Sequence, residues 1–157
     1  MLRPTIPDDT PTLLAIAERT GVFKPNELVA LHEVLDDFHK SPGQHQSHTC
    51  ESNGQILGLV YFAPAAMTDR TWYLYWIFVD KHTQAKGIGS ELLMFAEEQA
   101  RQANGRIMLI ETSGLPHYAL TRKFYLKNGY HLDAVLHDYY EDGDNMNIFC
   151  KRLSDQR

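Results

Sequence analysis

A long apolar segment, a glycine-rich turn and an amphipathic helix follow one another in the middle of this chain. Eight of the nine residues in 71–79 are aromatic or aliphatic, which is typical of a strand buried on both faces and therefore central in its sheet. The turn reads Gln-Ala-Lys-Gly-Ile-Gly over residues 84–89, and apolar residues at helical spacing then predict a helix over 88–103. A strand, turn and helix of this kind require a sheet with helices packed on its faces.

The rest of the chain completes such a sheet. We expect a short strand over 2–6, helices from Asp8 to Gly21 and over 25–40, and two strands around the Asn53-Gly54 turn. A strand over 106–112 and a helix over 117–127 follow, and a loop over 137–144 joins two final strands, 130–136 and 145–153. The predicted order is β-α-α-β-β-β-α-β-α-β-β, an α/β fold with a mixed sheet, in one domain over residues 1–157.

The net charge of the chain bears on which macromolecules it could bind. Fifteen Lys and Arg against twenty Asp and Glu give a net charge of −5 without basic runs, so we expect no nucleic acid and no membrane as partner. No apolar run reaches the ~18 residues that cross a bilayer. Residues 1–9 lack the apolar stretch of a signal peptide, which makes a cytoplasmic location the expectation.

The glycine-rich turn admits several interpretations. Its two glycines and the first turn of the helix, with unpaired N–H groups at the positive end of the helix dipole, are typical of a phosphate site, and Lys86 adds positive charge. A plain connecting turn is the simplest alternative. A dinucleotide fingerprint would need a third glycine where Leu92 stands, and a Walker A sequence is absent.

A known family matches this turn and its surroundings. Gln84, Gly87 and Gly89 fit the motif [QR]-x-x-G-x-[GA] between a central strand and a helix, so the chain resembles the GNAT superfamily of N-acetyltransferases. Residues 122–130, Arg-Lys-Phe-Tyr-Leu-Lys-Asn-Gly-Tyr, resemble the family's second signature. Some features are similar to ribosomal-protein N-alpha-acetyltransferases. The resemblance covers roughly residues 1–153 and implies one GNAT-like domain with a central, mostly antiparallel sheet flanked by helices.

The resemblance also implies acetyl-CoA as co-substrate. The pantetheine arm would lie along backbone groups of the central strand, and the pyrophosphate would rest on backbone N–H groups of the glycine-rich turn. The residues implied in this role are Ile77, Phe78, Val79, Gln84, Ala85, Lys86, Gly87, Ile88, Gly89 and Ser90.

Two side chains are expected to carry the chemistry. The resemblance places Tyr125 at the position of the acid that protonates the leaving thiolate, and Glu111 on the strand that carries the base in the ribosomal-protein enzymes. A strand glutamate paired with a surface lysine is the alternative for Glu111; Tyr73, Tyr75, a histidine or a water chain are alternatives for the base. The chain departs from the family at Tyr118, where many members have asparagine.

The acceptor side of the site is predicted in the loop over 137–144. This loop carries four acids, no Lys or Arg, and the pair Tyr139 and Tyr140, which resembles the peptide-holding loop of N-alpha-acetyltransferases. The charge favours a cationic acceptor, a primary amine on a small molecule or a peptide. The resemblance also allows a homodimer. A catalytically idle acyl-CoA-binding or sensor module is the alternative function.

Metal binding is not expected from the sequence. His45, His48 and Cys50 lie close together, but structural zinc usually needs four ligands and no second cluster with ligand spacing follows. Cys50 and Cys150 are therefore predicted to be small buried residues, and the predicted site contains no metal.

Overall fold

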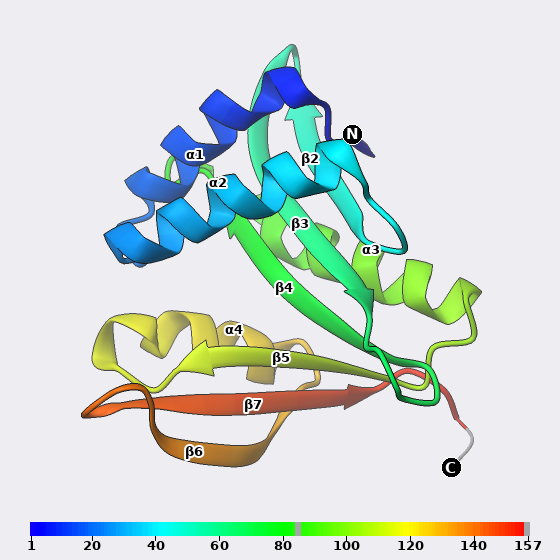
Figure 1. Ribbon diagram of the computed structural model, residues 1–157, viewed down its shortest axis with the longest axis vertical. Coiled ribbons are helices and arrows are strands. Elements are labelled where there is room, and N and C mark those ends of the chain that lie inside the picture. Colours follow the sequence, from blue (N-terminus) through cyan, green and yellow to red (C-terminus); the bar gives the residue numbers. More distant parts are fainter. Residues whose placement is uncertain (84–85, 156–157) are drawn as a thin grey trace. The chain divides into compact units, whose positions relative to one another are not determined.

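A computed structural model describes residues 1–83 and 86–155 of the chain, and its elements form a mixed α/β fold (Figure 1). Within these residues seven strands form one sheet in the order β1-β2-β3-β4-β5-β7-β6. The strands are β1 (Leu2–Pro4), β2 (Gln46–Ser52), β3 (Gln55–Pro64), β4 (Thr71–Val79), β5 (Ile107–Ser113), β6 (His131–Glu141) and β7 (Asp144–Arg152). The helices are α1 (Thr10–Arg19), α2 (Pro25–Lys40), α3 (Ile88–Gln102) and α4 (Ala119–Lys127). The predicted order of strands and helices is confirmed.

Strand β4 has the central place that its composition predicts, with three strands on either side of it in the sheet order. It pairs with β5 in parallel, whereas β1 with β2, β2 with β3, β5 with β7 and β6 with β7 pair antiparallel, so the sheet is mostly antiparallel as expected. The prediction that β4 is buried on both faces is wrong at Tyr75, whose side chain is 48% exposed.

The chain divides into two compact units, which we describe separately. Unit 1 comprises Met1–Ala63 and Trp76–Ala96, and unit 2 comprises Pro64–Tyr75 and Glu97–Arg157. The core of unit 1 is formed where α1 and α2 lay their apolar faces on β3 and on the end of β4. Its buried residues are Leu13, Ile16, Ala17, Leu31, Leu35, Leu59 and Phe78.

Two local features of unit 1 follow directly from the sequence. Asn53 and Gly54 both adopt positive φ, 52° and 75°, which a tight turn between two twisted strands requires. Before α1, the buried carboxylate of Asp9 accepts hydrogen bonds from Nη1 and Nη2 of Arg3, at 2.8 and 2.9 Å, and from the amide of Ile6 at 3.0 Å. This carboxylate fixes the start of the first helix to strand β1.

Unit 2 is built around β5 and β7. Seven consecutive residue pairs join these strands, from Ile107 opposite Arg152 to Ser113 opposite Met146. On one face of this pair the buried ring of Phe149 lies 5.7 Å from the ring of Tyr125 on α4. Helix α4 is therefore fixed to the sheet by aromatic packing.

The end of unit 2 differs from the prediction of a long loop over 137–144. Strand β6 continues to Glu141 and β7 begins at Asp144, so the chain reverses at Asp142 and Gly143 (Figure 1). Gly143 has φ of 86°, and its amide donates a 2.8 Å hydrogen bond to the Asp138 carboxylate. Asp138, with φ of 58°, lies in the irregular part of the register that extends the hairpin. Tyr139 and Tyr140 thus belong to a strand rather than to a loop.

Among the described residues, we find no helix with both the length and the apolar character needed to pass through a membrane.

Candidate functional site

The glycine-rich turn lies in unit 1, between β4 and α3. Two of its residues, Gln84 and Ala85, lie outside the described residues. Gly87 has φ of 77°, a left-handed conformation that favours glycine, and a Cβ built on it would meet no atom of the described residues within 4 Å. Helix α3 begins at the next residue, and its first backbone hydrogen bond runs from the Glu91 amide to the Gly87 carbonyl at 3.2 Å. The amides of Ile88, Gly89 and Ser90 precede that bond, as at any helix start.

The same unit holds the end of β4, over Ile77, Phe78 and Val79. The side chains of Phe78 and Val79 are buried, and Phe78 belongs to the core of unit 1. A Cβ on Gly58 of β3 would lie 2.4 Å from the carbonyl oxygen of Phe78, so glycine is required for this close backbone approach. Within the described residues the register between β4 and β5 covers only Thr71 to Leu74 and ends before this segment. Two of the three side chains, those of Phe78 and Val79, therefore serve the core.

Tyr125 lies in unit 2 on α4, and its side chain is only 4% exposed. Its ring packs against Phe149, at 5.7 Å, and Tyr130, at 6.1 Å. Burial raises the pKa of the Tyr125 phenol well above its ordinary value. The phenol carries its proton at neutral pH, as an ordinary tyrosine does, and burial makes it a weaker acid than an exposed tyrosine.

Glu111 lies on β5 of the same unit, and its side chain is exposed. Within the described residues it makes no ion pair with a basic side chain, so the surface-lysine alternative is not the arrangement observed there. Burial raises the pKa of Tyr73, and the Glu111 carboxylate raises it further through its charge and a side-chain hydrogen bond. The pKa of Tyr75 is also raised, first by burial and then by the charge of Glu111.

These residues form an aromatic and acidic cluster within unit 2. The rings of Tyr73 and Tyr75 stack with centroids 5.5 Å apart and planes 20° apart. The charge of Tyr139 also contributes to the raised pKa of Tyr73, which connects β6 with this group. Tyr139 and Tyr140 are both exposed, and their rings meet edge to face at 5.1 Å. A carboxylate beside exposed aromatic faces is suited to an organic ammonium group. We call Tyr73, Tyr75, Glu111 and Tyr139 the tyrosine–glutamate cluster.

The unusual connection between β5 and α4 is held by Arg122. Its Nη1 donates to the carbonyl oxygens of Ser113 and Leu115, at 2.9 and 2.8 Å. Tyr118, which stands where many family members have asparagine, is buried in this connection. At the position where the sequence departs from the family motif, a buried aromatic side chain thus replaces the asparagine.

Unit 2 contains a buried ionic centre that was not predicted from the sequence. Glu97 on α3 is 2% exposed, and it accepts hydrogen bonds from the Tyr130 hydroxyl at 2.8 Å and Lys151 Nζ at 2.9 Å. The signal was present, because Glu97 lies four residues after Leu93 on the apolar stripe of its helix. The sequence could not show which residues would compensate a carboxylate there.

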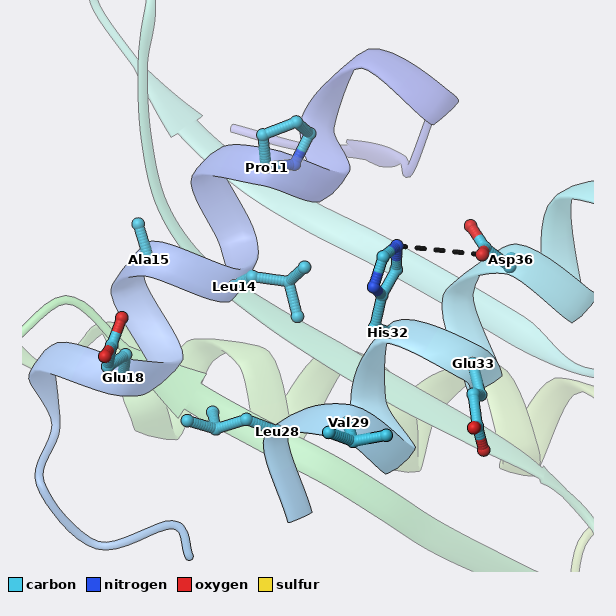
Figure 2. Close-up of a pocket in the computed structure, with 9 residues that line it drawn as sticks. All are labelled: Pro11, Leu14, Ala15, Glu18, Leu28, Val29, His32, Glu33 and Asp36. Carbon is cyan, nitrogen blue, oxygen red and sulfur yellow. Dashed lines mark ion pairs between the residues drawn. The ribbon is translucent and has the colours of Figure 1, made fainter. Parts of the chain in front are cut away.

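A surface groove in unit 1 contains none of the predicted site residues. It lies between α1 and α2, and the side chains that line it include Leu14 and the carboxylates of Glu18, Glu33 and Asp36 (Figure 2). The imidazole Nε2 of His32 lies 3.6 Å from the Asp36 carboxylate (Figure 2). All the residues that line this groove belong to α1 and α2, and none belongs to the turn before α3.

Comparison with known proteins places these features in a family. The family model of the acetyltransferase (GNAT) domain matches residues 43–132. A solved GNAT-family protein of Desulfovibrio desulfuricans is 30% identical, with a TM-score of 0.93 over 98% of this chain and 99% of that one. The uncharacterised N-acetyltransferase YhfO of Bacillus subtilis (strain 168) is 30% identical over 87 residues, 54% of this chain and 57% of the relative. This chain therefore aligns with little more than half the length of that curated relative.

A more distant structure, an aminoglycoside 6′-N-acetyltransferase complexed with coenzyme A, has a TM-score of 0.79 over 100% of this chain and 99% of that one. At 14% identity, its likeness concerns the fold. Together with the family-model match, the structural likeness shows that the chain belongs to the GNAT N-acetyltransferase family.

Proposed function

We propose that this protein transfers an acetyl group from acetyl-CoA to a primary amine, by direct attack of the amine in a ternary complex. One observation carries the proposal. Gly87 leaves open space beside the first-turn amides of α3, in a chain of the GNAT family that retains Gly87 and Gly89 of the motif. Helix N-termini of this kind suit the phosphates of coenzyme A. We also propose that residues 1–157 act as one functional domain, in the cytoplasm, where two free cysteines are compatible with reducing conditions.

The cofactor side of the proposal uses main-chain groups of unit 1. The exposed Lys86, Gly87 and the amides that open α3 would hold the phosphates. Ile77, Phe78 and Val79 would offer backbone groups to the pantetheine arm. Gln84 and Ala85 stay in the proposal on the motif alone. Acetyl-CoA supplies the acetyl group as a thioester, whose carbonyl carbon the amine nitrogen attacks.

The chemical side of the proposal uses two side chains of unit 2. An alkylammonium ion must lose a proton before attack, because such groups titrate near ~10. Glu111, exposed and without a basic partner among the described residues, would take this proton as the general base. Tyr125, whose phenol carries a proton at neutral pH, would give that proton to the departing thiolate sulfur. An N–H near Val79 would donate to the developing oxyanion.

The acceptor side rests on the tyrosine–glutamate cluster. Stacked tyrosines beside a carboxylate favour a cationic amine through cation–π attraction and charge. Tyr140, next to Tyr139 on β6, would extend this surface along the acceptor. The acceptor class is therefore a primary amine carried by a small cationic molecule or a peptide.

The experiment is a transfer assay on the full chain with acetyl-CoA and a panel of monoamines, polyamines and peptides with free N-termini. We expect thiol release with at least one class of amine and a loss of turnover of ~10²–10⁴-fold in Glu111→Gln. Glu98→Gln, at an exposed glutamate of unit 2 outside the cluster and outside residues 137–144, is the matched control and should retain activity. Acetyl-CoA binding without transfer to any amine would instead favour the catalytically idle module or an acceptor outside the panel.

A further inference from the structure

Strands β6 and β7 bring together three side chains that lie outside the proposed acetyl-transfer site. His131 on β6 is directly opposite Cys150 on β7 in the register. The register shifts between Leu132 and Ala134, so Asp133 is the extra residue of a β-bulge. The bulge brings the Asp133 carboxylate toward the other two side chains. One ligand atom from each of His131, Asp133 and Cys150 lies within 4.8 Å of the other two.

The three atoms are an imidazole nitrogen, a thiol sulfur and a carboxylate oxygen. Zinc accepts all three types, in tetrahedral sites with bonds of about 2.0–2.3 Å, which separate neighbouring ligand atoms by about 3.4 Å. The observed spread of up to 4.8 Å needs only a modest closing movement. His131 and Asp133 are exposed and their side chains can rotate, whereas Cys150 is 9% exposed and fixed in the strand. Calcium and magnesium prefer oxygen ligands alone, so this donor set selects against them.

The surrounding charges act in both directions. The Asp133 carboxylate lies 3.6 Å from His131 Nε2, a contact that also exists without any metal. Burial and the charge of Asp133 raise the pKa of the Cys150 thiol, whereas the charge of Arg152, two residues further along β7, lowers it. A metal ion bound to this sulfur would therefore have to displace the thiol proton.

We propose that His131, Asp133 and Cys150 form a binding site for zinc. Three protein ligands leave the fourth tetrahedral position to water. The ion would join the edge strand β6 to β7 at the bulge, where the ladder of backbone hydrogen bonds is interrupted. The site would have one coordination position open to solvent, and it does not depend on acetyl transfer. The residues His45, His48 and Cys50 do not form this site, because His45 Nδ1 is hydrogen-bonded to the Tyr61 hydroxyl at 2.8 Å and the His48 ring packs against Phe62 and Phe95.

The first test is a spectroscopic titration of the reduced, tag-free full chain with Co²⁺ as a probe for zinc. Tetrahedral cobalt bound to a thiolate has a charge-transfer band in the near ultraviolet, which reports the sulfur ligand directly. We expect one Co²⁺ per chain with this band, and displacement of the cobalt by Zn²⁺. Cys150→Ser should abolish the band, while Cys50→Ser, the matched control at the other free cysteine, should leave it unchanged.

The remaining ligands are tested by affinity and by stability. His131→Gln and Asp133→Asn should each lower the affinity for zinc at least about tenfold. Replacing a residue that only hydrogen-bonds to a metal ligand already lowers metal affinity by about that factor. His137→Gln, a second histidine of β6, is the control. Zinc should also raise the unfolding temperature of the wild type but not of Cys150→Ser. The proposal fails if the wild type shows no thiolate band, or if the three variants bind zinc as tightly as the wild type.

Discussion

The hydroxyl of Tyr130 donates a 2.8 Å hydrogen bond to the carboxylate of Glu97, inside unit 2. Lys151 Nζ binds the other carboxylate oxygen at 2.9 Å and the backbone carbonyl of Asn128, also at 2.9 Å. A charge buried in a protein is costly unless each of its oxygens has a partner. The contact therefore joins α3, the end of α4 and β7 through one compensated carboxylate, and the fold is destabilised if any partner is removed.

Tyr130→Phe should destabilise the protein by about 1–3 kcal/mol, because the buried Glu97 carboxylate loses one of its donors. The measurement is chemical denaturation of the two proteins. Tyr139→Phe removes the same hydroxyl from an exposed tyrosine of unit 2 and should change the free energy of unfolding by less than about 0.5 kcal/mol. Equal stability of the wild type and Tyr130→Phe would contradict the structural role of this contact.

Gly87→Ala should weaken acetyl-CoA binding, because φ of 77° disfavours any other residue and the turn must relax away from the α3 amides. The control is Gly43→Ala. Gly43 also has positive φ, 55°, and a Cβ added there would likewise meet no described atom within 4 Å, so its replacement brings the same kind of backbone strain. Calorimetric titration should show weaker binding in Gly87→Ala alone. Unchanged affinity there would remove the turn from the cofactor site.

Tyr125→Phe should lower turnover by ~10²–10⁴-fold and leave acetyl-CoA affinity nearly unchanged, because only the proton donor is lost. The aromatic packing against Phe149 and Tyr130 needs no hydroxyl, so the variant should fold normally. Steady-state kinetics and calorimetry separate the two effects. Turnover equal to that of the wild type would mean that Tyr125 only packs α4 on the sheet.

The Asp9 carboxylate should make the stability of the protein depend on pH. Burial alone would raise its pKa, but hydrogen bonds from Arg3, the Ile6 amide and Thr49 hold it below the ordinary value. A lowered folded-state pKa contributes stability above the unfolded value of about 3.9, and this contribution is lost as pH falls through the folded-state pKa. Asp9→Asn should therefore be less stable than the wild type at pH 7, and the difference should shrink in acid. A difference that is constant from pH 7 into acid would contradict the ionic role of Asp9.

Local signals in the sequence predicted most of the fold. The Asn53-Gly54 turn, the acids before α1 and the glycine-rich turn before α3 each act within a few residues, so propensity and spacing were sufficient. The extension of β6 to Glu141 was missed, because acids and tyrosines near a glycine are typical of a loop. The hairpin instead continues through the bonds of Asp138 to Asn145 and Gly143.

The side chains that act over long sequence distances could not be predicted. Glu97 finds its partners 33 and 54 residues further along the chain, and only the folded sheet brings them together. The packing of the buried Tyr125 ring against Phe149 likewise depends on how α4 lies on the sheet, which no local pattern shows. His131 lies opposite Cys150 because of the strand register, and Asp133 lies near both because of a β-bulge. The hydrophobic periodicity of the sequence shows neither feature.

The most direct test of the account is to count both products of one reaction, the free thiol of coenzyme A and the acetylated amine. The full chain is incubated with acetyl-CoA and the amine that gives the fastest thiol release, and mass spectrometry follows the amine and the protein. The account predicts one acetylated primary amine for each thiol released and no acetyl group left on the protein. Thiol release without acetylated amine, or an acetylated protein as an obligatory intermediate, would contradict direct transfer.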